Sequence, residues 1–287
     1  MAGISQFVIQ SAILSGLYAL VAVGFTLIFG VGGVLNLAHG ASIVLGAYGV
    51  YFATSVLGLT TGLGFVVGLL LPAAFSGLLY LGIIKRFDHE PIMVMILTLV
   101  TSIAVELLVL NTAGSQPVAI PQFVPGNFTL AGTSVQYNLL AVFVLSWLII
   151  VGLFLFVNYT KTGKAILAVS MSDKGASLVG IDSGRINLIT WVIAGVLAGI
   201  AGIALGSQLG ATFAMGRNPL ILSFSIVVLG GIGSIRGSVV GAYIIGFIEV
   251  GFVQFISSDL TGIAPLLVLV GVLLVKPEGL FGRELAE

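Results

Sequence analysis

The chain has no cysteine, few histidines and few charged residues. Of its 287 residues, two are histidine and only 7% are charged. The absence of cysteine excludes disulfide bonds, thiolate metal sites and cysteine nucleophiles. With His39 and His89 as the only imidazoles, we expect no histidine-cluster metal site. The formal net charge is zero, which argues against a nucleic-acid partner.

The scarcity of charge sets the class of protein. Hydrophobic residues make up 59% of the chain, and the mean hydropathy is +1.25. A soluble domain carries about 25% charged residues, so a soluble surface is excluded. The sequence predicts an all-α polytopic membrane protein in a lipid bilayer. Its single transmembrane domain (residues 1–287) would have about nine spans, each about 20 residues long and some broken at glycine-rich stretches.

One polar segment (residues 159–187) lies between long apolar runs. It carries Lys161, Lys164, Lys174 and Arg185. Short loops rich in Lys and Arg stay in the cytoplasm, so this segment is predicted to be cytoplasmic. Counting spans from it places the N-terminus outside the cell and the C-terminus inside.

The polar segment also has helix signals. Ser172 followed by Asp173 is typical of a helix start. Gly180 is typical of a helix end with left-handed backbone, after which Ile181 could pack on the last turn of the helix. We therefore expect a short helix over Ser172–Val179, shaped to press into a cytoplasmic partner. The alternative is an ordinary connecting loop with one helical turn.

Two glycine-rich stretches interrupt the apolar runs. The first surrounds Asn36 and His39, and the second (Gly230–Gly237) contains Arg236. Irregular backbone at membrane depth persists only where protein or a water cavity covers it, and paired breaks of this kind indicate a transport site. Alternatively, Asn36 and His39 hold neighbouring helices together.

Three further expectations concern the remaining spans. The glycines of the segment 188–209 recur at four-residue spacing, which predicts a central packing helix. Glu106 is expected near a span end, at the membrane interface. Arg217 is expected in an external turn.

No catalytic or nucleotide-binding motif is present. Lys161–Lys164 lacks the earlier glycine and the following Ser or Thr of a phosphate loop, and GGIGSIRG does not match the dinucleotide pattern. We find no nucleophile–base pair, so the chain is not expected to be an enzyme or to bind a cofactor. Energy for transport would come from a partner ATPase or, alternatively, from an ion gradient.

Four stretches resemble the LivH-type permeases of branched-chain amino acid ABC importers. They are VGFTLIFGVGGVLNLAHG with LGAY (23–48), TKTGKAILAVSMSDKGASLVGI (160–181), LGGIGSIRGSVVGAYIIGFIE (229–249) and KPEGLFGR (276–283). The pair NLAHG and GGIGS is the specific part of the resemblance. The resemblance implies a fold similar to that of vitamin B12- and ribose-type importers, located in the cell membrane.

The resemblance also implies partners. A LivM-like sister permease would pair with this chain, although a second copy of the chain is the alternative. Two cytoplasmic ATPases of the LivG and LivF kinds would bind ATP and Mg²⁺, and an extracytoplasmic binding protein would deliver the substrate.

Site residues follow from the matched positions. In that family the short helix predicted over Ser172–Val179 is the coupling helix, which contacts the ATPase. The contact is expected at Asp173, Lys174, Gly175, Ala176, Leu178, Gly180 and Ile181. The substrate path is expected near the two glycine breaks, at Asn36, His39, Gly40, Gly231, Gly233 and Arg236.

Departures from the family pattern leave the substrate open. Ala41 stands where an acidic residue is frequent, Arg236 where Pro is usual, and Ser223-Phe224 where Lys-Ala is common. Branched-chain or other neutral amino acids are the leading substrates. Urea or short amides, or a secondary carrier driven by an ion gradient, are the alternatives.

Overall fold

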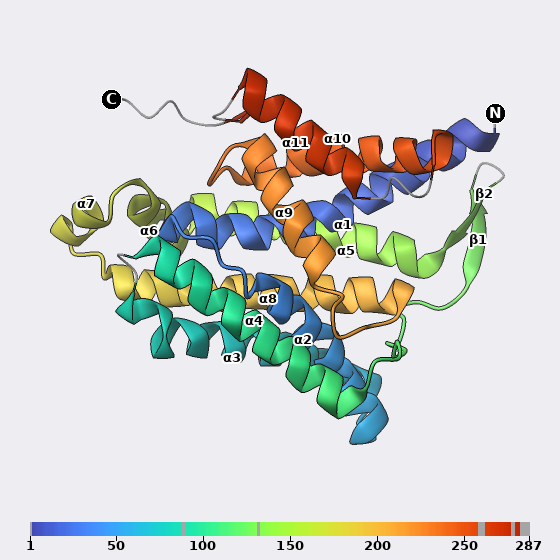
Figure 1. Ribbon diagram of the computed structural model, residues 1–287, viewed down its shortest axis with the longest axis horizontal. Coiled ribbons are helices and arrows are strands. Elements are labelled where there is room, and N and C mark those ends of the chain that lie inside the picture. The colour runs from blue at the N-terminus through green and yellow to red at the C-terminus, as the bar shows by residue number, and fades with distance from the viewer. Residues whose placement is uncertain (1, 88–89, 131–132, 258–261, 277–278, 282–287) are drawn as a thin grey trace. The chain divides into compact units, whose positions relative to one another are not determined.

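The computed structural model describes residues 2–87, 90–130, 133–257, 262–276 and 279–281 (Figure 1). His89 lies outside the described residues. The helices, in chain order, are α1 (Ala2–Gly32), α2 (His39–Tyr51), the π-helix η1 (Phe52–Val56), α3 (Thr61–Gly82), the 3₁₀ turn η2 (Ile84–Arg86), α4 (Pro91–Ala113), α5 (Tyr137–Tyr159), α6 (Lys161–Met171), α7 (Asp173–Leu178), α8 (Ser183–Leu209), α9 (Arg217–Gly230), α10 (Ile235–Phe255) and α11 (Ile263–Val275).

The membrane class is confirmed. Within the described residues, six helices are long and apolar enough to cross a bilayer, namely those in α1, α3, α4, α5, α8 and α10. The helices α2, α9 and α11 are shorter, with 13, 14 and 13 residues. An apolar helix of this length falls short of the roughly 20 residues that a crossing needs.

The all-α expectation missed a small hairpin. Strands β1 (Asn127–Leu130) and β2 (Thr133–Gln136) pair antiparallel in the segment between α4 and α5. The backbone N–H of Tyr137 donates to the carbonyl of Gly126 at 3.0 Å, and the Tyr137 ring stacks on Phe128 with centroids 5.0 Å apart. These contacts give order to a segment that its prolines exclude from helix.

The described chain divides into two compact units. The first contains residues 1–26, 122–151 and 221–287. In it, the Oγ atoms of Thr26 and Ser238 lie 2.6 Å apart, and Trp147 donates to the Tyr243 hydroxyl at 2.8 Å. These hydrogen bonds satisfy polar groups that apolar surroundings would otherwise leave without partners.

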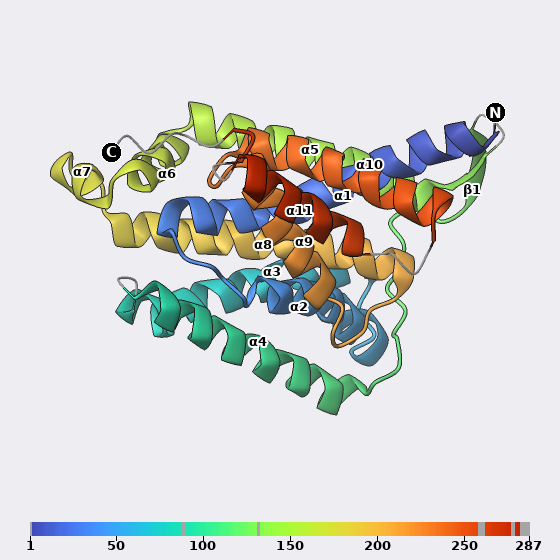
Figure 2. The same ribbon diagram turned by 45° about the horizontal axis from the view of Figure 1, so that its top comes forward.

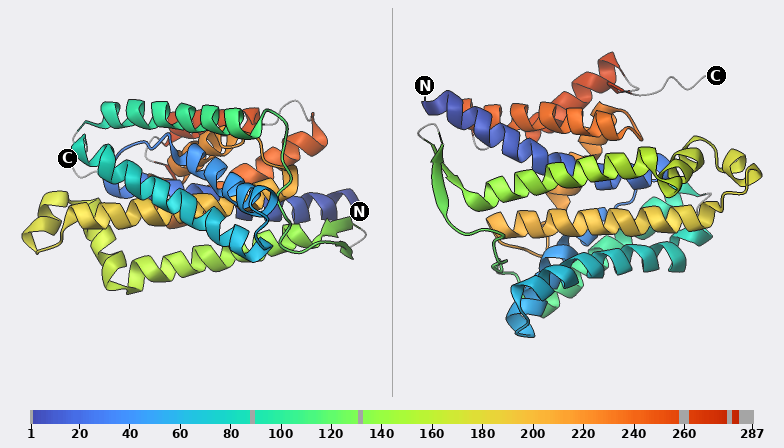
Figure 3. Two further views of the ribbon diagram at one scale, coloured as in Figure 1. Left: turned by 90° about the horizontal axis from the view of Figure 1, so that it is seen from below. Right: turned by 180° about the vertical axis from the view of Figure 1, so that it is seen from behind.

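The second unit contains residues 27–121 and 152–220 and is built around α8. Figure 3 shows α8 (yellow) running beside α3 (blue-green) in this unit. A Cβ atom at Gly195 would meet the Pro72 carbonyl, and one at Gly202 would meet that of Ile43. Glycine therefore lets the helix backbones touch, and the prediction of a central packing helix is confirmed.

The first glycine break lies where the sequence places it. Helix α1 ends at Gly32, Gly33 has a left-handed φ of 62°, and the chain runs without helix until α2 begins at His39. A second non-helical segment, 210–216, separates α8 from α9. Its first residue, Gly210, also has a positive φ of 75°.

Candidate functional site

The short helix of the polar segment forms with the expected signals. Ser172 is the N-cap of α7, and its Oγ accepts from the Gly175 N–H at 3.0 Å. Gly180 has φ 83°, and the Ile181 N–H donates back to the Ala176 carbonyl at 3.0 Å. These two caps stabilise a helix of only six residues, which is otherwise too short to persist.

Burial divides the residues of α7 into an anchor and an exposed face. Ala176 is buried with Ile166, Val169 and Ile186, and Ile181 packs against this cluster. Leu178 is 88% exposed and Val179 is 74% exposed, while Asp173, Lys174, Gly175 and Gly180 are also exposed. The expectation that Ala176 contacts a partner is therefore corrected, because it holds α7 against α6 and α8. Leu178 and Val179, which the sequence placed in one apolar patch with Ala176, both present their side chains to the outside.

Helix α6, which the sequence left as loop, carries α7. The Thr160 hydroxyl caps it by accepting from the Gly163 N–H at 2.9 Å. A Cβ atom at Gly163 would collide with the backbone of Phe156 and Val157, so glycine permits the sharp corner after α5. Figures 1 and 2 show α7 extending beyond the first turn of α8, within the second unit.

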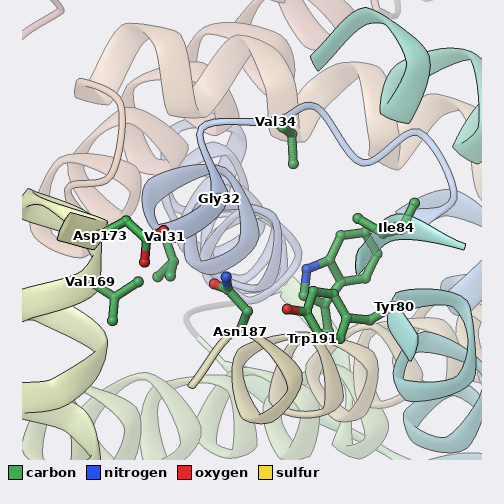
Figure 4. Close-up of a pocket in the computed structure, with 9 residues that line it drawn as sticks. All are labelled: Val31, Gly32, Val34, Tyr80, Ile84, Val169, Asp173, Asn187 and Trp191. Carbon is green, nitrogen blue, oxygen red and sulfur yellow. The ribbon is translucent and has the colours of Figure 1, made fainter. Parts of the chain in front are cut away.

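A cavity of about 220 Å³ lies behind α7 (Figure 4). Asp173 of α7 lines one side of the cavity, and Asn187, Trp191 and Tyr80 line other parts of its wall with their polar groups. The remaining walls come from the end of α1 and the first break, from α3 and η2, and from α6, through Val31, Gly32, Val34, Ile84 and Val169. The cavity thus connects the expected coupling helix with the segment that leads to Asn36 and His39.

Asn36 forms a turn in the first break. Its Oδ1 accepts from the Ala38 N–H at 3.0 Å, and its carbonyl accepts from the His39 N–H at 3.3 Å. Asn36 is 2% exposed. This is the side-chain turn that lets Asn replace helical backbone bonding. These two bonds hold Asn36 to its own turn rather than to a neighbouring helix, and its place in a substrate path stays a prediction.

His39 and Gly40 are also buried. His39 opens α2 and is 1% exposed. A Cβ atom at Gly40 would meet the Gly216 carbonyl at 2.8 Å. The break is therefore packed directly against the second non-helical segment, 210–216. Both residues are buried in the described part of the second unit, and their place in a substrate path stays a prediction.

The stretch Gly230–Gly237 is a helix corner. It joins α9 to α10, with Gly231 at φ 96° and Gly233 at φ 77°. The Ser234 Oγ caps α10 by accepting from the Gly237 N–H at 3.0 Å. Since α10 is itself a candidate span, this corner lies at a span end. The break between helices that the sequence predicted at these glycines is present, and their place in a substrate path stays a prediction.

The C-terminal segment closes the same corner. The N–H groups of Leu280 and Phe281 donate to the carbonyls of Leu229 and Gly230, at 2.8 and 3.0 Å. Two stretches that carry the family resemblance, 229–249 and 276–283, therefore meet here. Arg236 is exposed on this corner, and its role in a substrate path is not supported.

Glu106 and Arg217 form an ion pair that the sequence analysis missed. Arg217 donates from Nε and Nη2 to the Glu106 carboxylate, at 3.0 and 2.6 Å. Glu106 is buried within α4, seven residues before the helix ends. Two signals were available in the sequence. Glu106 was a lone carboxylate in a predicted span, and Arg217 was a basic residue in a predicted external turn, although Lys and Arg favour cytoplasmic loops.

Comparison with known proteins identifies the family. Residues 7–273 match the family described as branched-chain amino acid transport system / permease component. The chain is 30% identical to the high-affinity branched-chain amino acid transport system permease protein LivH of Escherichia coli K12, over 98% of this chain and 96% of that protein. It is also 30% identical to BraD of Pseudomonas aeruginosa, over 98% and 97% of the two chains.

A solved structure supports the fold. PsaBC from Streptococcus pneumoniae in complex with Fab matches with a TM-score of 0.50 and 15% identity, over 94% of this chain and 90% of that one. The family match over residues 7–273 and the relatives aligned over nearly their whole length agree with the helical membrane fold described above. The chain belongs to the family of branched-chain amino acid transport permease components.

Proposed function

We propose that the chain is the transmembrane permease subunit of an ATP-driven importer of branched-chain or other neutral amino acids. The observation that carries the proposal is the family match over residues 7–273, together with named permeases that align with this chain over nearly their whole length. The chain moves substrate, and separate ATPase subunits hold ATP and Mg²⁺.

The proposed topology places the N-terminus outside and the C-terminus inside, in the cell membrane. The six long helices make six crossings. The three shorter helices α2, α9 and α11 complete three more, each with the help of non-helical segments. Nine of the ten Lys and Arg residues then fall on the cytoplasmic side, as short loops require. The tenth, Arg217, lies within the membrane beside Glu106.

The proposed contact with the ATPase is the exposed face of α7. Leu178 and Val179 supply apolar surface, and Asp173 and Lys174 supply charges at its rim. An amphipathic helix that inserts apolar side chains into a groove is a common recognition mode. The anchoring of Ala176 in the cluster on α6 and α8 supports this role, because a rigidly held helix transmits displacement to its supports.

The cavity behind α7 offers a route for that displacement. It is bounded by Asp173 on the coupling side and by Val34 of the first break on the other. A push on α7 would change the space between α6, α8 and the segment that precedes α2. Close packing elsewhere in the unit would carry the movement onward.

The proposed assembly contains a LivM-like sister permease, two ATPases of the LivG and LivF kinds, and an extracytoplasmic binding protein. The test is uptake of radiolabelled leucine, isoleucine or valine into proteoliposomes that contain this complete assembly. We expect uptake that requires ATP on the ATPase side and the binding protein on the other. Uptake by this chain alone, driven by an imposed ion gradient, would contradict the proposal.

A further inference from the structure

The Glu106–Arg217 pair lies at membrane depth. Glu106 is four residues past Ser102, the middle residue of the 23-residue helix α4, or about 6 Å along the helix axis. A bilayer core is about 30 Å thick, so Glu106 falls well inside it. Charged residues at this depth are costly and typically mark a substrate or ion pathway.

Arg217 reaches the same depth by an unusual route. The Tyr48 hydroxyl donates to the Ala211 carbonyl at 3.3 Å, near the end of α2. Gly216 packs against Gly40, which lies eight residues earlier in α2, or about 12 Å along its axis. The residues between Ala211 and Gly216 therefore run back along α2 without helix. Backbone of this kind at membrane depth needs protein or a water-filled cavity around it.

The two partners of the pair differ in exposure. The Glu106 side chain is 10% exposed, whereas that of Arg217 is 62% exposed. More than half of the Arg217 side chain is thus uncovered by the protein, while its guanidinium binds the Glu106 carboxylate. A second carboxylate could approach the guanidinium without prior unfolding of any element of the second unit.

We propose that Glu106 and Arg217 together bind the charged backbone of an α-amino acid on its way through the membrane. The substrate carboxylate would take the place of Glu106 on Arg217, in the two-bonded geometry that guanidinium favours. The substrate ammonium would bind the carboxylate that is released. One ion pair would become two, and the site would stay neutral throughout. The inference rests on the proposed function and specifies the part of the substrate that the membrane subunit recognises.

This assignment separates the substrate classes that the sequence left open. Urea and short amides carry no charges to exchange with the pair, so breaking it for them would leave two charges unpaired in the membrane. A zwitterion replaces both partners at once. A site of this kind is indifferent to the side chain, which suits the transport of several neutral amino acids.

A purely structural ion pair is the competing explanation. It would fasten the start of α9 to α4 and would need only opposite charges, in either order. Exchanging the two residues distinguishes the explanations. The double variant Glu106→Arg/Arg217→Glu restores a pair, but it would hold the amino acid with its ammonium and carboxylate reversed and its side chain misdirected.

The experiment uses the complete assembly in proteoliposomes. It compares the wild type, Glu106→Gln, Arg217→Gln, the exchanged double variant and the neighbouring exposed control Asn218→Ala. We expect each single charge removal to lower leucine uptake at least about tenfold, the scale of one charged hydrogen bond. The exchanged variant should regain the thermal stability of the wild type but not its uptake. Asn218→Ala should match the wild type in both.

Two outcomes would overturn this inference. They are single variants that import leucine at the wild-type rate, and an exchanged variant that recovers full uptake. Both leave the proposed function intact, because the wild-type assembly still imports. Failure of the wild type itself to import any amino acid with ATP would instead reject the proposed function.

Discussion

At the scale of single residues, polar groups in this chain serve two different purposes. Asn36 turns its side chain onto its own backbone and is buried, so it shapes the start of α2. Glu106 of α4 and Arg217 of α9 instead bind each other. The Arg217 side chain is largely exposed, whereas that of Glu106 is buried. Polarity inside a membrane segment thus marks a structural turn in one case and a candidate binding site in the other.

Replacing Asn36 tests the structural assignment. Asn36→Ala removes the acceptor for the Ala38 N–H and should destabilise the protein by about 1–2 kcal/mol, the typical cost of a lost side-chain cap or turn bond. Thermal unfolding of the purified assembly measures this, with Asn218→Ala as the exposed control. Uptake per folded assembly should be unchanged. A loss of uptake without a loss of stability would return Asn36 to the substrate path.

At the scale of elements, glycine determines where helices meet. Helix α8 presents Gly195, Gly199 and Gly202 to α2 and α3, and an added Cβ atom at each would meet neighbouring atoms closely. Lipid supplies no hydrophobic drive for helix association, so close backbone approach provides the attraction. The second unit depends on this packing for the position of α2 and of the break that precedes it.

A matched pair of glycine substitutions tests this packing. Gly202→Ala places a methyl group against the Ile43 carbonyl and should destabilise the protein by about 1–3 kcal/mol, as overpacking usually does. Gly152→Ala, in α5, meets nothing within 4 Å and should be neutral or slightly stabilising, because alanine favours helix. Thermal unfolding of both variants provides the measurement. Equal stability of the two would show that α8 does not pack as described.

The sequence predicted the local elements better than it predicted the contacts between distant ones. Ser172 and Gly180 identified α7 to within one residue, because caps are local signals that depend on a few neighbouring atoms. The glycines of α8 identified a packing helix for the same reason. The glycines at 231 and 233 could not be assigned from the sequence alone, because glycine permits a sharp corner between two helices as readily as a break within one. The pairing of Glu106 with Arg217 could not be read from a chain in which 111 positions separate them.

At the scale of the whole molecule, the chain belongs to a family of transport permease components, and its proposed source of energy is a partner ATPase. Within the described residues no group of three or more metal-binding side chains comes together, and the sequence holds no nucleotide motif. Membership of the permease family and the exposed face of α7 both fit a subunit that is driven by others. We propose that α7 transmits the movement of a partner ATPase during ATP hydrolysis to the transmembrane helices.

Substrate-stimulated ATP hydrolysis by the complete assembly tests that claim most directly. Leu178→Asp places a charge on the exposed face of α7 and leaves the Ser172 cap and the Ala176 anchor in place, with Lys164→Ala on α6 as the control. The account predicts that Leu178→Asp loses at least about tenfold of the stimulated hydrolysis, the scale of one buried apolar anchor at an interface, while Lys164→Ala retains it. Stimulated hydrolysis at the wild-type rate in Leu178→Asp would contradict the account.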